Sequence, residues 1–249
     1  MKLVTFNTRC PVEADGVNYL PNRIPGICSR ISREQPDVIG FQELEESGLQ
    51  PLEAALTEYH FIGTGRGADH TGEGARIAFH KERLALLAMD QFWLSPTPRV
   101  PASRYEQQSR CPRVAVWAKL LHRESGVCFY FVNTHLDHQF EEARALGLKQ
   151  IFETIRTLKV IEDLPVFITG DFNLTPESPS YALIAENGFT DLTASISGSF
   201  HDYGTREPVK IDYILTDALG SSDVQSWHEC NDGLYLSDHD ALAVCWKAE

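Results

Sequence analysis

The chain has 249 residues, 43% of them hydrophobic and 23% charged, and its formal net charge is −13. Because neither a low-complexity linker nor a fixed-period repeat divides it, we expect one domain over residues 1–249 with a full hydrophobic core. The acidic charge argues against a general nucleic-acid coat, since phosphate backbones require a basic surface.

The N-terminal residues resemble a strand and not a signal peptide, and no apolar run reaches the length of a membrane span. We therefore expect a soluble, cytoplasmic protein with no membrane contact and no evident obligate protein partner. The six cysteines form no CxxC pair, which argues against a zinc knuckle, and we expect free thiols.

Strands and helices alternate in the first third of the chain. An apolar strand over residues 2–7 ends in an asparagine, and isoleucines recur at helical spacing over residues 23–34. Pro25 fits the first turn of that helix. The other elements expected here are a strand at 37–43, a helix at 48–59, a short strand at 60–63, the glycine-rich loop 63–74 and a strand at 76–80.

Strands then follow one another without clear helices between them. The loop 95–112 has four prolines and no periodicity, and residues 91–123 carry six basic side chains and one acidic one. This segment is either a solvated loop with scattered charges or a basic lip that faces an anionic substrate. The expected elements are strands at 84–94, 113–122, 127–135, 166–170, 209–215, 224–227 and 241–246, and helices at 141–159 and 181–186.

Two groups of strands mixed with helices favour an α/β class of fold, either α+β or a layered α/β sandwich. Because many strands follow one another directly, antiparallel pairing should dominate. The pattern alone does not choose between the two architectures.

Polar side chains follow the expected strands at the points where the strands end. Asp171 and Asn173 come directly after a buried strand and, being two apart, point the same way on an extended backbone. An Asx turn is the alternative interpretation. The other such residues are Asn7, Glu43, His135, Asp238, His239 and, inside an apolar strand, Asp212. Together they supply hard oxygen ligands for Mg²⁺ and two imidazoles, which is the chemistry for attack of water on a phosphate ester.

Short fragments carry a resemblance to a known family. They are Thr5–Asn7, Phe41–Glu43, Pro112–Arg113, Asn133–His135, Gly170–Asn173, Ile211–Ile214 and Ser237–His239. In this order the set resembles the endonuclease/exonuclease/phosphatase superfamily, which has the deoxyribonuclease-like fold. The resemblance implies a four-layer α/β/β/α sandwich, in which two mainly antiparallel sheets pack face to face with helices outside. Phe92–Ser95 and Ser199–His201 also resemble a group of bacterial members.

The resemblance further implies a metal site and a catalytic pair. Glu43 would bind Mg²⁺ or Mn²⁺ with help from Asn7 and Asp238. His239, oriented by Asp212, would take a proton from the attacking water or hold the phosphate. Whether one metal or two is bound stays open.

The same resemblance implies roles for four further residues. His135 would contact the phosphoryl oxygen, Asp171 would position or deprotonate water, and Asn173 would stabilise the transition state. Arg113 would neutralise the phosphate. Whether Asp171 or His239 is the general base is not decided by the sequence.

One departure from the family pattern concerns the partner of His135. Many members carry a glutamate before the strand that follows the glycine-rich loop, and Glu73 is the nearest acid here. Arg76 stands where a small polar residue is common, so it either reaches the substrate or is an exposed strand charge. His201, in the bacterial-type fragment, is a further candidate for substrate binding.

The leading hypothesis is a Mg²⁺-dependent phosphoesterase that hydrolyses a phosphodiester or phosphomonoester by activated-water attack. The acidic charge favours a small phosphorylated molecule or a nucleic-acid end over long duplex DNA. The alternatives are an endonuclease or exonuclease acting on DNA or RNA, a non-catalytic phosphate-binding module, and a phospholipase of the sphingomyelinase type. The filled catalytic positions argue against the second, and the lack of an export signal argues against the third.

Overall fold

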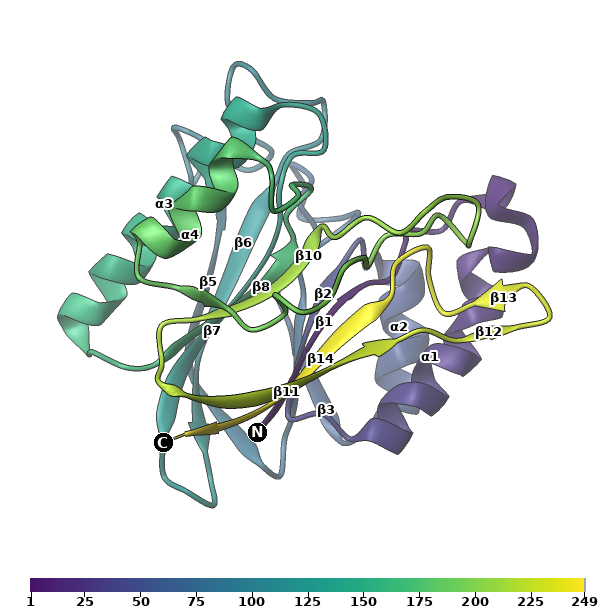
Figure 1. The fold of residues 1–249 in the computed structure, drawn as a ribbon, viewed down its shortest axis with the longest axis horizontal. Coiled ribbons are helices and arrows are strands. Elements are labelled where there is room, and N and C mark those ends of the chain that lie inside the picture. Colours follow the sequence, from purple (N-terminus) through teal and green to yellow (C-terminus); the bar gives the residue numbers. More distant parts are fainter. Residues whose placement is uncertain (249) are drawn as a thin grey trace.

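Two six-stranded sheets pack face to face in this computed structural model, which describes residues 1–248 (Figure 1). Glu249, the last residue of the expected domain, lies outside the described residues. In spatial order the first sheet contains β11 (Gly220–Trp227), β14 (Ala241–Ala248), β1 (Lys2–Asn7), β2 (Val38–Gln42), β4 (Ile77–His80) and β3 (Tyr59–Ile62). The second contains β5 (Leu84–Trp93), β6 (Val114–His122), β7 (Cys128–His135), β8 (Val166–Asp171), β10 (Asp212–Thr216) and β9 (Thr190–Asp191). A hairpin of β12 (Cys230–Asn231) and β13 (Leu234–Tyr235) stands apart.

Helices cover the outer face of each sheet, on opposite sides of the molecule in Figure 1. Three apolar clusters match this layering, one between the sheets and one under each helical layer. The four-layer sandwich is therefore confirmed. On the first sheet lie α1 (Leu20–Glu34) and α2 (Glu46–Ala55), and on the second lie α3 (Glu141–Ile161) and α4 (Ala182–Glu186). Two 3₁₀ turns precede helices in the chain, η1 (Glu13–Asn18) before α1 and η2 (Pro179–Tyr181) before α4. None of the helices within residues 1–248 has the length and apolar character to cross a bilayer.

Antiparallel pairing dominates, as expected. In the two large sheets, the parallel neighbours among the described strands are β1 with β2 and β7 with β8. A helix connects the two strands of each pair, α1 in the first and α3 in the second. Each parallel pair therefore ends at one edge of its sheet, which places Asn7 beside Gln42 and His135 beside Asp171.

Several element boundaries differ from the expected ones. Helix α1 begins at Leu20, so Pro21 occupies its first turn and Pro25 lies inside it. Helix α2 ends at Ala55 because the chain leaves helical geometry at Leu56 and Tyr59 then pairs with His80. Strand β10 begins only at Asp212, whereas β11 is longer than expected. The short elements η1, β9, β12 and β13 gave no sequence signal, since each has too few residues to show a periodicity.

The two sheets approach closely below the edge where the parallel strands end. A Cβ atom at Gly40 would lie 2.2 Å from Oγ1 of Thr169 and 2.5 Å from Oδ1 of Asn133, so only glycine fits there. Next to it, Nε2 of Gln42 donates to Oδ1 of Asn133 at 2.7 Å, and Nδ2 of Asn133 donates to the Phe41 carbonyl at 2.8 Å. These buried bonds between the sheets fix the end of β2 relative to the end of β7.

Candidate active site

A cleft of about 340 Å³ opens where the parallel strands end. Of the residues predicted from the sequence, it is lined by Glu43, Arg113, His135, Asp171, Asn173, Asp238 and His239. Asn7 and Asp212 lie directly behind this lining and are bonded to it. Segments that are far apart in the chain therefore converge on one cleft, as the sequence analysis predicted.

The acidic part of the cleft is built on β1 and β2. Nδ2 of Asn7 donates to Oε1 of Glu43 at 3.1 Å, and the backbone N–H of Cys10 donates to Oε2 at 3.0 Å. Burial alone would raise the pKa of Glu43, but these two hydrogen bonds and the charges of His239 and Arg9 together outweigh it, so its pKa is lowered and the carboxylate stays charged. Glu43 has a positive φ of 58°, which turns the chain sharply after β2.

Asp238 lies beside this carboxylate and is 5% exposed. Burial raises its pKa, and the negative charge of Glu43 adds to that effect. Nε of Arg9 lies 3.8 Å from Oδ2 of Asp238 and 3.1 Å from Oδ2 of Asp15. Two carboxylates thus share a small volume with one guanidinium at its rim, a concentration of negative charge that favours a cation.

An imidazole between two carboxylates forms the floor. Nδ1 of His239 lies 2.8 Å from Oδ2 of Asp212, which also accepts from the Ser199 hydroxyl at 2.7 Å. Nε2 of His239 lies 3.8 Å from Oδ2 of Asp171. Burial opposes a charged imidazole, but Asp212 first and then Asp171 outweigh it and raise the pKa of His239. Burial and the charge of Asp212 raise the pKa of Asp171.

The partner of His135 is Asn173. Nδ2 of Asn173 lies 3.0 Å from Nε2 of His135 and also donates to the Leu136 carbonyl at 3.1 Å. Because that carbonyl can only accept, the amide orientation is fixed, and Nε2 of His135 faces this amide nitrogen together with Oδ2 of Asp171, which lies 3.3 Å away. Burial lowers the pKa of His135 well below its usual value, and the charge of Arg113 adds to this. Asn173 holds its position through a backbone N–H bond to Oδ1 of Asp171 at 2.9 Å and a positive φ of 50°.

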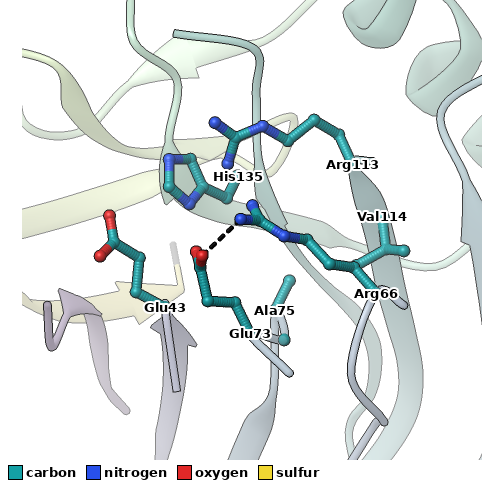
Figure 2. A pocket seen from close by; sticks show the side chains of 8 residues that line it. Glu43, Arg66, Glu73, Ala75, Arg113, Val114 and His135 are labelled. Carbon is teal, nitrogen blue, oxygen red and sulfur yellow. Dashed lines mark hydrogen bonds and ion pairs between the residues drawn. The ribbon is translucent and has the colours of Figure 1, made fainter. Parts of the chain in front are cut away.

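A cationic wall faces these residues, and Figure 2 shows it together with Glu43 and His135. Arg113 is 4% exposed, and its Nη2 lies 3.0 Å from Nδ1 of His138. Its Nε and Nη1 atoms are buried and have no partner among the residues that the structure describes. Burial and the neighbouring charge of Arg66 lower the pKa of Arg113. Buried donors without an acceptor are rare in folded proteins, so these atoms mark a place for an anionic group.

Glu73 lies in the same wall but is engaged elsewhere. Its Oε1 is 2.5 Å from Nη2 of Arg66, the contact drawn as a dashed line in Figure 2. Glu43, Glu73 and His135 each offer an atom within one group that could hold a metal ion. No direct hydrogen bond joins Glu73 to His135 among the described residues, so Glu73 is close to His135 without being its bonding partner.

Two of the predicted substrate-binding residues do not lie in the cleft. Arg76 is 5% exposed, and it pairs with Glu46 at 2.5 Å and donates to the Gly63 carbonyl at 2.7 Å. Its guanidinium thus fastens the start of α2 to the glycine-rich loop. Arg76 is therefore not an exposed strand charge, and it does not line the cleft, because backbone carbonyls and Glu46 surround its guanidinium.

His201 is likewise placed behind the cleft and is 3% exposed. Its Nε2 lies 3.2 Å from Oδ1 of Asp240, which is also 2.8 Å from Nδ1 of His228. The Gly204 N–H donates to Nδ1 of His201, so Nε2 carries the proton and faces Asp240. These three residues form a hydrogen-bonded cluster that supports the loop after Phe200, and His201 does not line the cleft.

The basic loop is mostly an ordinary solvated segment. Arg99 pairs with Asp90, Lys119 pairs with Glu162, and Arg104 donates to the Ser109 carbonyl. Of the six basic residues, the cleft is lined by Arg113 alone. The interpretation as a basic lip therefore holds for one residue.

Several residues that line the cleft were not identified from the sequence. They are Arg9, Cys10, Arg66, Cys111, His138, Phe200 and Ile211. All lie in loops, where no periodicity indicates which way a side chain points. The available signals were the basic Arg66 inside a glycine-rich loop and the places of Phe200 and Ile211 within the fragments that carry the family resemblance.

Comparison with known proteins agrees with this architecture. The family model of the Endonuclease/Exonuclease/phosphatase family matches residues 4–239, and the chain belongs to that family. Family members are metal-dependent hydrolases that act on ester bonds, as phosphoesterases or nucleases. Family membership thus confirms the expected enzyme class.

Three similar proteins illustrate the range of identity and coverage in these comparisons. The endonuclease/exonuclease/phosphatase from Bacteroides vulgatus is 31% identical and superimposes with a TM-score of 0.93 over 100% of this chain and 98% of that chain. The mannosyl-6-phosphatase of Bacteroides thetaiotaomicron is 24% identical, with a TM-score of 0.88 over 99% of both chains, and shows the fold alone. The CCR4-Not complex 3'-5'-exoribonuclease subunit Ccr4 of Emericella nidulans is 22% identical over 85% of this chain, which spans 41% of that protein's length.

Proposed function

We propose that this chain is a Mg²⁺-dependent phosphoesterase, with Mn²⁺ as an alternative ion, built as one domain over residues 1–249. It hydrolyses a phosphodiester or phosphomonoester by attack of activated water. The observation that carries the proposal is the pairing, across one cleft, of a cluster of acidic oxygens with the unpartnered buried donors of Arg113. One side suits a cation and the other suits a phosphoryl oxygen.

The residues present fit a hard divalent ion. Glu43 and Asp238 offer carboxylate oxygens, and Asn7 has an amide oxygen that accepts from the Arg9 N–H at 2.9 Å. The hydrogen bonds to Glu43, one of them from Nδ2 of Asn7, keep that carboxylate ionised. When bound, the ion would polarise a phosphoryl oxygen and offset the charge that builds up during the reaction. We propose these three residues as the ligands.

Water activation falls to Asp171 and His239. Asp212 holds Nδ1 of His239, so Nε2 is directed towards Oδ2 of Asp171 and the cleft. A water between these two groups would be oriented for in-line attack and could pass its proton to either of them. The separation of 3.8 Å between Nε2 of His239 and Oδ2 of Asp171 supports this proposal, and the choice of base stays open.

Stabilisation of the transition state falls to the other wall. His135 contacts Asn173, which in turn donates to the Leu136 carbonyl, so both side chains are preorganised. Arg113 brings a permanent positive charge and two free donors. Such fixed groups in a buried site lower the barrier more than the same groups would in water.

The substrate that we favour is a small phosphorylated molecule or a nucleic-acid end. A cleft of about 340 Å³ is at the small end of the range for ligand pockets, and the net charge of −13 disfavours long duplex DNA. Action on DNA or RNA is the second candidate, because a curated relative is an exoribonuclease. All the proposed catalytic positions carry competent side chains, which argues against a non-catalytic module.

A substrate screen tests the proposal. Sugar phosphates, nucleotides, bis-p-nitrophenyl phosphate and short oligonucleotides are incubated with Mg²⁺ or Mn²⁺, with a chelator as the control. We expect hydrolysis of at least one class that stops on chelation. A wild-type protein no faster than the His239→Ala protein on every class, with either ion, would refute the proposal.

A further inference from the structure

Arg23 on α1 is among the most deeply buried charged residues, with 1% of its surface exposed. No carboxylate lies within ion-pair distance of it among residues 1–248. Its guanidinium instead donates to four backbone carbonyls. These are Asn18 O from Nε at 2.5 Å, Thr8 O and Leu236 O from Nη1 at 2.6 and 2.8 Å, and Arg9 O from Nη2 at 3.0 Å. A buried cation is costly unless its donors are satisfied, and here four of the five N–H groups are.

Three of the four carbonyls belong to loops next to two of the proposed metal ligands, and the fourth, Asn18 O, lies at the end of η1. Thr8 and Arg9 directly follow Asn7, and Leu236 lies two residues before Asp238. One further bond joins the same two loops, because the Ser237 hydroxyl donates to the Asn7 carbonyl at 2.7 Å. The planar guanidinium therefore connects both loops from behind the acidic part of the cleft.

The anchor itself is rigid. Helix α1 packs its apolar face on the first sheet through Ile27 and Ile31, which are both fully buried. Arg23 lies one turn before Ile27 on that helix, so its Cα atom is fixed in position relative to β1. Arg23 therefore ties the loop after β1 and the loop before β14 to the same fixed position on α1.

Resting on the proposed function, we propose that Arg23 is a positioning residue for the metal site, because it sets the separation between Asn7 and Asp238. Lysine cannot replace it, since one ammonium group has three donors and cannot span four carbonyls from three segments. Changes to groups that orient metal ligands commonly weaken metal binding about 10–100-fold. A role in stability alone would leave the affinity of the folded protein for the ion unchanged.

Mn²⁺ binding, followed through the electron paramagnetic resonance signal of the free ion, tests this without any substrate. We expect the dissociation constant to rise about tenfold or more in Arg23→Lys and Arg23→Met. In hydrolysis by the Arg23 variants, the metal concentration for half-maximal rate should rise by a similar factor. At saturating metal, their kcat should approach the wild-type kcat. The matched control is Arg30→Met on the same helix, which removes contacts to Glu229, Glu34 and Trp227 away from the cleft.

Two outcomes would overturn the proposal. One is wild-type Mn²⁺ affinity in a folded Arg23 variant, and the other is an equal loss of affinity in Arg30→Met at equal loss of stability. Should the Arg23 variants not fold, Ser237→Ala carries the test, because it removes the second tie between the same loops. An unchanged Mn²⁺ affinity in Ser237→Ala would then refute it. A wild-type protein that binds no Mn²⁺ would instead count against the proposed function.

Discussion

The two walls of the cleft are organised differently. The wall of Asn7, Glu43, Asp171, Asp212 and His239 sits at or next to strand ends, and most of its side chains are bonded to one another, although buried Oδ1 of Asp212 has no partner among the described residues. The wall of Arg66 and Arg113 comes from a loop and the residue before a strand, and it keeps buried donors without acceptors. The difference teaches that the side chains of the first wall are held by one another, whereas the second wall keeps donors that the described residues leave unpaired.

Removing a residue of the strand-borne wall should have the largest effect. Asp171→Ala and His239→Ala should lower kcat by about 10²–10⁴-fold, the usual contribution of a positioned acid or base. Circular dichroism and thermal unfolding report whether the fold is kept. Wild-type rates in either folded variant would remove these residues from the site.

A change at the metal side should come next. Glu43→Gln keeps the shape but removes the charge that suits a divalent ion, so the Mg²⁺ concentration for half-maximal rate should rise by at least about 10–100-fold, the cost seen for outer-shell changes. A Mg²⁺ titration of hydrolysis measures it. A curve that superimposes on that of wild type would contradict the assignment of Glu43 as ligand.

Replacing Arg113 in the second wall should lower the activity but should not lower the stability. Arg113→Met should lower kcat/KM about 10–100-fold, since charge-assisted hydrogen bonds contribute about 1.5–3 kcal/mol each. The free energy of unfolding should stay equal or rise, because an unpartnered buried charge is removed. Steady-state kinetics and urea unfolding measure the two effects. The matched control is Arg99→Met in the same stretch, where an exposed arginine pairs with Asp90. A destabilised Arg113→Met protein would show that Arg113 has a structural partner.

The smallest effect should come from a change at Asp137, which lies close to Arg113 of the second wall. Asp137 accepts from the backbone N–H groups of Gln139 and Phe140 at 3.0 and 2.8 Å and from Ser109. Burial opposes its charge, but these bonds lower its pKa. Asp137→Asn should therefore cost about 1–3 kcal/mol of unfolding free energy near neutral pH.

The pH dependence of that cost has a definite sign. A lowered pKa in the folded state adds stability above the unfolded value of about 4, and the gain is lost as pH falls through the lowered pKa. The gap between wild type and Asp137→Asn should therefore narrow in urea unfolding at acidic pH. A gap that stays constant or widens would mean that the charge of Asp137 does not contribute.

The strand-borne residues could be predicted from the sequence because each follows an apolar run that also fixes its position. Asp212 is the clearest case, since a carboxylate inside a buried strand requires a partner, and that partner is His239. The roles proposed for Arg76 and His201 came from loops and strand starts, where neighbouring carbonyls and carboxylates decide the direction of the side chain. Arg66 and His138 were missed for the same reason. Contacts across 25 residues, such as Arg113 with His138, leave no periodic signal.

In an antiparallel sheet, adjacent strands finish at opposite edges, so one edge collects the end of every second strand. The parallel pairs β1–β2 and β7–β8 depart from that rule at the centre of each sheet. Each strand–helix–strand unit brings two neighbouring C-terminal ends to the same edge, and stacking the two units brings four such ends to one cleft. The surrounding loops could therefore be exchanged for others, and the choice of substrate altered, without moving the reacting groups.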